Sequence, residues 1–205
     1  MPRTSARGGP QTRARILEVA TRLFLDRGYD TVTVAEIARE AGVSSVTVFN
    51  HFPRKEDLFL DRQDDAADLL RSAVRDRADG VDVLASLREA TLQLFDTRHP
   101  LSGVDGRSVP FFHTVAGSPA LVARAREIAS DLERILAEEL ERDPVFAGDG
   151  PLFAALFIAG YRTVLVATAR HLIAEEPSDA VLADHRVRLE RLFDALRLGV
   201  GSPGS

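Results

Sequence analysis

The chain has 205 residues, no cysteine and a formal net charge of −5. An apolar share of 45% allows a sizeable buried core and excludes wholesale disorder. The lack of cysteine excludes a disulfide framework, thiolate metal ligands and a cysteine nucleophile. The first arginines are followed by no apolar segment, so we expect no secretory signal.

Charge is distributed unevenly along the chain. Residues 1–62 hold ten basic and eight acidic side chains, whereas the remainder holds sixteen basic and twenty-three acidic ones. The first fifteen residues contain four arginines and no acid. This asymmetry indicates an acidic body with a basic end, as an electrostatic contact confined to one end would require. Arginines in a tail also occur without function.

Apolar periodicity predicts a first helix that ends at Gly28. Its buried face follows the helical i, i+3, i+4, i+7, i+8 spacing and comprises Ile16, Val19, Ala20, Leu23 and Phe24. Gly28 then stands where a left-handed residue commonly closes a helix.

Two short helices are expected next. Thr33 and Glu36 have the spacing of a capping box, which opens a helix with the inner face Ile37, Ala38 and Ala41. Gly42 ends that helix. Ser44 is suited to cap a third helix, which Pro53 ends.

The rest of the chain also shows helical patterns. We expect a long helix from Lys55 to about Asp79, followed by helices near 82–97, 119–142, 151–175 and 179–198. Ser118 followed by Pro119 is typical of a helix start. The segment 103–117 is expected to be irregular, with one or two short turns. Because we find no convincing strand pattern, the predicted fold class is all-α.

The longest apolar stretch, "GPLFAALFIAGYRTVLVATA", carries Arg162 near its middle. A charge at the centre of a bilayer is costly, so we interpret this stretch as a buried helix rather than a membrane span. We therefore expect a cytoplasmic protein without a membrane partner.

The second and third predicted helices fit a helix-turn-helix motif. Ala38 allows a close approach of the two helices, and Gly42 can take the positive φ of the turn. Val43 and Val48 would hold the helices together. The side chains left on the outside are Ser44, Ser45, Val46, Thr47, Asn50 and His51. Short polar groups of this kind suit a helix that enters the major groove of DNA. The alternative is a helical hairpin inside a bundle.

Residues 12–59, "TRARILEVATRLFLDRGYDTVTVAEIAREAGVSSVTVFNHFPRKEDLF", resemble the DNA-binding domain of the TetR family of transcriptional regulators. The resemblance implies a homodimer whose two N-terminal three-helix domains bind neighbouring major grooves of an inverted-repeat operator in double-stranded DNA. It also implies a C-terminal helical bundle that dimerises and binds a small-molecule effector. The expected divisions are a flexible basic arm (1–11), the DNA-binding domain (12–56, with its helix-turn-helix at 33–52), the effector and dimerisation domain (57–199) and a flexible tail (200–205).

The resemblance also implies roles for individual residues. The implied DNA-contacting set is Arg13, Thr33, Ser44, Ser45, Val46, Thr47, Phe49, Asn50, His51 and Lys55. Thr33 would meet a phosphate at a helix N-terminus, and Lys55 would anchor another at the start of the fourth helix. The family usually has a small residue in place of Val46 and tyrosine in place of Phe49. Val46 could contact a thymine methyl group, and Phe49 could serve packing alone.

Family position makes the last two helices, about 151–175 and 179–198, the expected dimerisation pair. The first of them is apolar on nearly every side, which requires burial against both its own body and a partner. In the second, the apolar stripe comprises Leu182, Leu189, Leu192, Phe193 and Leu196. The neighbouring Arg186, Arg188 and Arg191 form either a solvated face or interface ion pairs.

The candidate effector-binding residues lie on the inner helices and are Phe95, Phe111, Phe112, His113, Phe157, Tyr161 and Arg162. The aromatic ones could equally be core residues. A buried Arg162 needs either an internal acid such as Asp96 or a ligand anion. "GSPALVARAREIASDLERILAEEL" resembles the corresponding helix of actinobacterial TetR regulators with acyl-CoA-type ligands, the mycofactocin-associated regulators among them, which implies an apolar or amphipathic, acyl-CoA-like effector.

No catalytic or cofactor motif stands out. The five histidines have no metal-ligand spacing, and neither a phosphate loop nor a G-x-S-x-G motif occurs. We therefore expect no enzyme activity, metal or cofactor. The favoured hypothesis is a ligand-responsive transcriptional repressor. The alternatives are a constitutive DNA-binding dimer without an effector, and a helical small-molecule carrier that has lost DNA binding.

Overall fold

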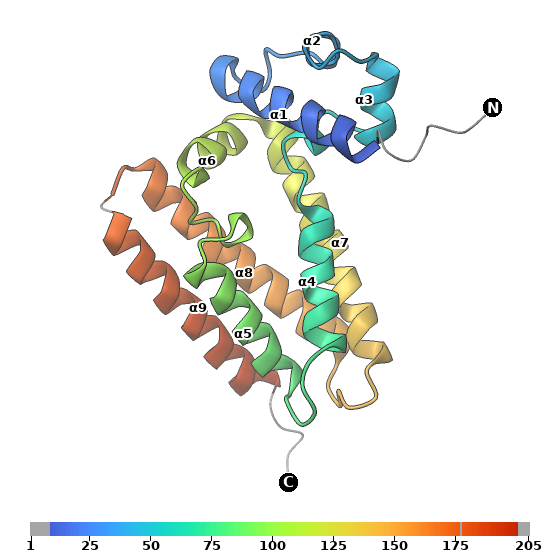
Figure 1. The fold of residues 1–205 in the computed structure, drawn as a ribbon. Helices are drawn as coiled ribbons and strands as arrows, with labels where there is room; N and C mark the ends of the chain where they lie inside the picture. The colour runs from blue at the N-terminus through green and yellow to red at the C-terminus, as the bar shows by residue number, and fades with distance from the viewer. Residues whose placement is uncertain (1–8, 177, 201–205) are drawn as a thin grey trace, which may run out of the picture. The chain divides into compact units, whose positions relative to one another are not determined.

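The computed structural model describes residues 9–176 and 178–200 and is all-helical over these residues, which confirms the predicted fold class (Figure 1). Residues 1–8 of the expected arm and 201–205 of the expected tail lie outside the described residues. Residues 9–11, expected in the arm, already belong to the first helix, and Val200 is the last residue of the last helix.

The chain divides into two compact units. The head unit comprises residues up to Asp61 together with His113–Ala125, and the body unit comprises Arg62–Phe112 and the residues from Arg126 onward. Two helices, α6 (Ser108–Gly117) and α7 (Pro119–Arg142), begin in one unit and continue into the other. The backbone is therefore continuous and helical at both of these crossings.

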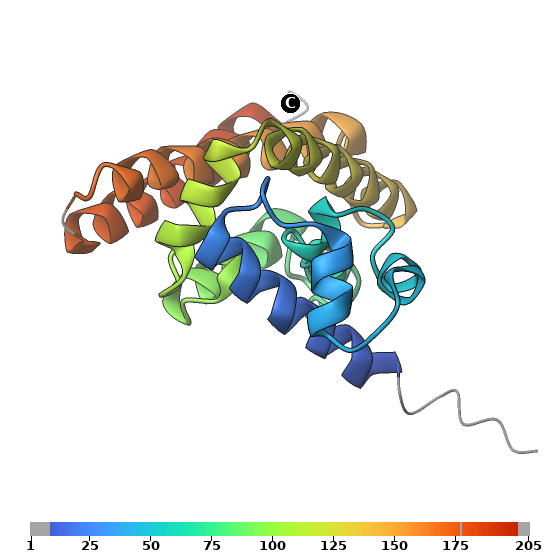
Figure 2. The same cartoon turned by 90° about the horizontal axis from the view of Figure 1, so that it is seen from above.

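The head unit is built on α1 (Gly9–Arg27), α2 (Val34–Glu40) and α3 (Ser45–His51), followed by a 3-10 turn, η1 (Glu56–Leu58). Figure 2 shows α1, α2 and α3 running in different directions. The predicted inner faces are confirmed, except that Val19 is only half-buried. The fully buried large side chains here include Ile16, Phe24, Val32, Ile37 and Leu58.

The body unit contains α4 (Gln63–Arg75), α5 (Val83–Asp96), the 3-10 turn η2 (Pro100–Ser102), α8 (Gly150–Ile173) and α9 (Ser178–Val200), with parts of α6 and α7. Helices α8 and α9 lie side by side along most of their length (Figure 1). They pack so closely that a Cβ on Gly160 would lie 2.2 Å from Cδ1 of Leu192. The absence of a side chain at Gly160 therefore makes room for Leu192 of α9 against α8.

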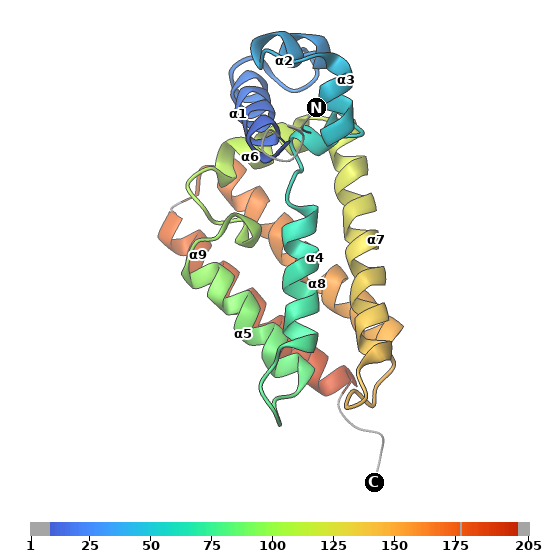
Figure 3. The ribbon, with the colours of Figure 1, turned by 45° about the vertical axis from the view of Figure 1, so that its right-hand side comes forward.

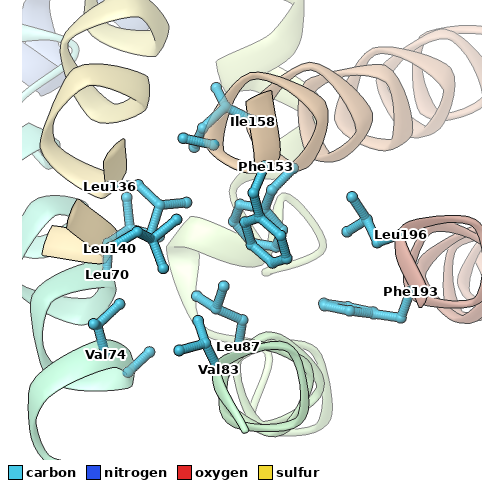
Figure 4. Packing of buried hydrophobic residues seen from close by; sticks show 13 residues of the cluster. Leu70, Val74, Val83, Leu87, Leu136, Leu140, Phe153, Ile158, Phe193 and Leu196 are labelled. Carbon is cyan, nitrogen blue, oxygen red and sulfur yellow. The ribbon is translucent and has the colours of Figure 1, made fainter. Parts of the chain in front are cut away.

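The core of the body unit draws on every long helix. Figure 4 shows Leu87, Leu136, Phe153 and Phe193 converging from α5, α7, α8 and α9. A charged pair ties α4 to α7, which run alongside one another in Figure 3. Arg75 makes a two-pronged salt bridge to the carboxylate of Glu139, whose side chain is only 4% exposed. A charge buried this deeply requires such a partner.

Two expectations about the helices are wrong. The predicted continuous helix from Lys55 to Asp79 is broken, because Leu58 and Phe59 turn inward and bury themselves in the head unit, and α4 begins only at Gln63. The segment 103–117, expected to be irregular, contains the ten-residue helix α6. Its proline, Pro110, stands in the first turn, where the absent N–H has no helical acceptor to lose.

Helix α8 is long and apolar enough to cross a membrane by length and composition. In the structure it packs against α9 and contributes seven buried residues. Three large apolar side chains of α8 are nevertheless exposed: Leu152, Leu156 and Val166. Helix α8 is therefore partly buried and partly exposed, although its sequence is apolar on nearly every side.

Candidate nucleic-acid interface and effector cavities

The start of α2 is held by the predicted capping box. The Thr33 hydroxyl accepts from the Glu36 backbone N–H, and the Glu36 carboxylate accepts from the Thr33 backbone N–H at 2.9 Å. Arg27 at the end of α1 donates to the same carboxylate at 2.8 Å. The hydrogen bond from Thr33 and that from Arg27 lower the pKa of Glu36 to about 2. Glu36 is therefore ionised and joins α1 to α2.

The turn between α2 and α3 has the expected geometry. Gly42 has a φ of +64°, and Val43 donates its backbone N–H to the Ala38 carbonyl at 2.9 Å. Ala38 and Ala41 are buried, so that the two helices approach closely. Val48 is fully buried, whereas Val43 is only half-buried. The helix-turn-helix is thus formed by local signals that the sequence carries.

Helix α3 begins at the Ser44 cap, whose hydroxyl accepts from the Thr47 backbone N–H at 3.0 Å. The Ser44 and Thr47 hydroxyls also hydrogen-bond to one another at 2.9 Å. The other outward residues differ in exposure. Val46 is 69% exposed and Phe49 is 48% exposed; Asn50 is also exposed, while Ser45 and His51 are half-buried. The sequence allowed a role for Phe49 in packing alone, and the structure leaves 48% of this residue exposed.

Lys55, the only lysine of the chain, points into the head unit. Its ammonium donates to the Tyr29 carbonyl at 2.6 Å and lies 4.1 Å from the centre of the Tyr29 ring. Burial lowers the pKa of Lys55. We expected Lys55 at the start of the fourth helix. It instead precedes η1, because α4 begins only at Gln63. Lys55 therefore fastens the loop after α1 to the segment after α3.

Arg13 also contacts the end of α3. Its guanidinium carbon lies 4.9 Å from the centre of the Phe52 ring, and Phe52 is the buried C-cap of that helix. Stacking on the ring orients the guanidinium without using its five N–H donors. Arg13 is thus held beside the helix-turn-helix with its hydrogen-bonding capacity intact.

The junction of α6 and α7 forms part of the head unit. Ser118, expected to cap α7, instead hydrogen-bonds to Asp30 at 3.0 Å, although α7 does begin at Pro119 as predicted. Arg124 donates to Asp57 at 2.8 Å, with both side chains less than one-fifth exposed. The sequence gave no signal for these two contacts, because the partners are separated by 88 and 67 positions.

Of the five aromatic residues predicted to line an effector pocket, Phe157 is buried and the other four are half-buried. Phe157 is buried against Phe193 and Tyr161, and the Tyr161 hydroxyl donates to the Leu101 carbonyl at 2.9 Å. Burial raises the pKa of Tyr161. The remaining aromatic candidates lie on other helices. Phe95 stacks on His185, and Phe111 meets Phe112 edge to face.

Two of the predicted effector residues have surroundings that differ from the expectation. Arg162, expected as a cation in apolar surroundings, is exposed because it falls on the outer side of α8. Asp96, the acid considered for it, pairs with Arg186 at 2.6 Å instead. His113 is exposed as well, and it belongs to the head unit rather than to the inside of the body.

The described part of the body unit includes two open cavities. One, of about 440 Å³, lies between α4 and α5 and is lined by apolar residues that include Leu69, Ala73 and Leu94 and by polar residues that include Gln93 and His99. The other, of about 520 Å³, lies near Arg88, Phe146 and Arg197. None of the seven predicted effector residues lines either cavity. The lining of the first follows from how α4 pairs with α5, which the sequence pattern did not specify.

One titratable group is fully buried in the body unit. The His185 side chain is 0% exposed, its Nδ1 shares a hydrogen bond of 2.7 Å with the Thr168 hydroxyl, and its ring stacks on Phe95. Its Nε2 has no hydrogen-bond partner among residues 9–176 and 178–200. Burial lowers the pKa of His185 to about 4. The imidazole is therefore neutral at physiological pH.

Within the described residues, no three histidine, aspartate or glutamate side chains gather in a way that could hold a metal ion. The outer face of α3 and the two cavities described above are the candidate sites.

Comparison with known proteins gives consistent results. Residues 16–61 match the family model for bacterial regulatory proteins of the tetR family. The chain is 36% identical over 99 residues to the HTH-type transcriptional regulator TtgR of Pseudomonas putida, a match that covers 47% of each protein. The matched segment thus spans about half the length of this curated relative, which is a transcriptional regulator rather than an enzyme.

Solved structures extend the likeness to nearly the whole fold. NalD of Pseudomonas aeruginosa, the secondary repressor of a multidrug efflux pump, is 20% identical, with a TM-score of 0.59 and coverage of 97% of this chain and 100% of that one. FadR of Thermus thermophilus, a transcriptional repressor in complex with lauroyl-CoA, is 26% identical, with a TM-score of 0.53 and coverage of 94% and 100%. At 20% identity, the similarity to NalD concerns the fold alone.

Proposed function

By its N-terminal domain this chain belongs to the TetR family of bacterial regulatory proteins, and from this premise we propose that it is a ligand-responsive transcriptional repressor released from a palindromic operator by a small effector. The observation that carries the proposal is the exposed outer face of α3, held at a fixed angle by the Gly42 turn. A helix of this kind can lie in the major groove with its first residues on base edges.

Residues around α3 would fix the head on the DNA backbone. Arg13, held on the Phe52 ring, retains its donors for phosphate. An ammonium has three donors, so Lys55 can hold the Tyr29 carbonyl and also reach a phosphate. Thr33 stands beside the ionised Glu36, so its phosphate contact would come from the backbone around α2 rather than from its hydroxyl.

We propose that the chain is a homodimer through α8 and α9. The exposed large apolar side chains of these helices are Leu152, Leu156, Val166, Val187 and Leu198. Such a face is typical of a helical dimer interface, because burial would remove it from water. Arg186 and Arg188 pair with Asp96 and Asp184 of their own chain, which supports the interpretation of a solvated face beside the apolar one.

The effector is proposed to be apolar or amphipathic and to bind in the body unit. Both cavities fall within the size range of small-molecule sites. The complex of FadR with lauroyl-CoA supports an acyl-CoA-like molecule as the first candidate. An alternative position, among Phe95, Phe157 and Tyr161, would require the core to open.

Effector binding would act through helices α6 and α7, which continue from one unit into the other. A ligand that binds one arrangement of the body more tightly would favour that arrangement. In a dimer this changes the separation of the two α3 helices, which must match major grooves about 34–36 Å apart. A regulator that acts on chromosomal DNA in this way would be cytoplasmic.

The test is selection of genomic fragments with the purified protein, followed by gel shifts of the recovered sequence at two salt concentrations. We expect the recovered sequence to be an inverted repeat, and its binding by the protein to weaken steeply as the salt concentration rises. At either salt concentration, Asn50→Ala should bind this repeat more weakly than the parent protein does. Leu25→Ala is the matched control, because Leu25 is exposed on α1 and not on α3. Binding without sequence preference would contradict the operator function.

The effector is tested on the same complex with lauroyl-CoA, lauric acid and free coenzyme A. Release by lauroyl-CoA alone would support an acyl-CoA-like effector, and release by lauric acid would indicate an apolar acid. Tyrosine fluorescence can follow effector binding, because the chain has no tryptophan and only two tyrosines. In Tyr29→Phe the remaining tyrosine is Tyr161, which lies in the body unit. Operator binding that no compound releases would favour a constitutive DNA-binding dimer.

A further inference from the structure

The outer face of α3 carries two large apolar side chains that are accessible to solvent. Val46 is 69% exposed and Phe49 is 48% exposed. They are three residues apart, so they lie on the same side of the helix. In water this arrangement is unfavourable, because apolar surface is stabilised by burial. It becomes favourable if both side chains meet apolar groups in the DNA.

The same face lacks the side chains that most often read guanine. Between Arg39 and Arg54 the sequence contains no arginine or lysine. Bidentate contacts from these two residues are the commonest specific contacts to guanine. The Ser44 and Thr47 hydroxyls hydrogen-bond to one another at 2.9 Å, which uses one of their two O–H donors. His51 is only half-exposed, whereas Phe49 and Asn50 before it are exposed.

Besides the Ser44 hydroxyl, the exposed polar group on this face is the side-chain amide of Asn50. An amide can donate to N7 and accept from N6 of adenine in the major groove. Adenine pairs with thymine, whose C5-methyl group projects into the same groove. One polar and two apolar side chains on α3 thus match the groups that A·T pairs present there.

We propose that α3 recognises its operator through thymine methyl groups, which Val46 and Phe49 contact, and through adenine, which Asn50 contacts. Each half-site then contains A·T pairs where α3 enters the groove. This inference rests on the proposed operator function and specifies which bases the head reads. It also accounts for the two positions where the sequence departs from the family pattern.

Deoxyuridine substitution tests the inference, because uracil differs from thymine only by the absent methyl group. Single thymines of the recovered operator are replaced in turn, and dissociation constants are measured with the full chain. We expect about fourfold weaker binding for each contacted methyl, and about fifteenfold when both half-sites lose it. Replacing a contacted T·A pair by C·G and then by 5-methylcytosine·G should restore part of the loss.

Protein variants identify the side chain responsible. In Val46→Ala, the thymine-to-uracil penalty should disappear at one position of each half-site and persist at the others; in Phe49→Ala, it should disappear at a different position. Leu25→Ala should keep every penalty. Both substituted residues are largely exposed, and circular dichroism can verify that the helices are retained.

The outcomes separate this inference from the proposed function. Sequence-specific binding that is indifferent to uracil at every position would overturn methyl recognition and leave the operator function standing. A uracil penalty that is unchanged in Val46→Ala and Phe49→Ala would also overturn it. Failure to recover any operator would overturn both.

Discussion

The head and body units reach their structures by different means. In the head unit, α2 and α3 have only seven residues each, too few to be stable alone, and side-chain caps, a left-handed glycine and a small buried core hold them. In the body unit, α7 and α8 have 24 residues each and are held by a large apolar core. Local signals therefore determine the geometry of the α2–α3 turn in the head, whereas tertiary packing determines the geometry of the body.

This difference has a functional consequence. A reading helix must be placed with little variation, and local caps and turns achieve that with few residues. A core made of many interchangeable apolar side chains tolerates substitution as long as its volume is kept. If the body binds an effector, as we propose, such a core would let its ligand specificity change without loss of the fold.

The largest effect is expected from a cavity in the body core. Phe193→Ala removes a fully buried ring that packs against Phe157 and should lower the free energy of unfolding by about 3–5 kcal/mol. Val145→Ala is the control, because Val145 is 76% exposed and should change stability by less than about 0.5 kcal/mol. Urea unfolding followed by circular dichroism measures both. Equal effects would mean that Phe193 does not lie in a close-packed core.

A smaller effect is expected from the buried histidine of the body. Because the folded-state pKa of His185 is about 4, below the ordinary 6.5, the unfolded chain binds this proton first as the pH falls. The neutral imidazole therefore makes its full contribution to the free energy of unfolding above about pH 6.5. This contribution decreases as the pH falls toward about 4, and the decrease between about pH 7.5 and about pH 5 is about 2 kcal/mol.

His185→Asn provides the comparison, since the amide can still bond to Thr168 but does not titrate in this range. The variant should be less stable than the parent at neutral pH and should lose less stability on acidification. Parallel pH dependences of the two proteins would show that His185 titrates normally and is not desolvated.

The smallest effect is expected in the head, at the turn between α2 and α3. Gly42→Ala meets no atom within 4 Å, so its cost is the left-handed φ of +64° alone, about 1–2 kcal/mol. Gly117→Ala, also in the head unit, is the matched control, because space is open there and φ is not positive. Thermal unfolding compares the two. A Gly42→Ala protein as stable as the control would show that backbone strain does not fix this turn.

The sequence by itself determined the features that depend on neighbouring residues. The capping box of Thr33 and Glu36, the cap at Ser44, the Gly42 turn and the limits of α5 and α7 were all predicted, because their partners lie within four positions along the chain. The helical period likewise predicted the buried faces of α1 and α9, apart from a few half-buried positions.

Only the tertiary structure decided the features that depend on distant residues. It broke the helix after Lys55, because burial of Leu58 and Phe59 in the head outweighs local helix propensity. It placed Arg162 on the outside of α8, because a helix that is apolar on nearly all sides does not reveal which side meets α9. It also turned the Lys55 ammonium toward Tyr29, 26 positions away. Periodicity along a chain identifies an apolar face, but only packing determines what covers it.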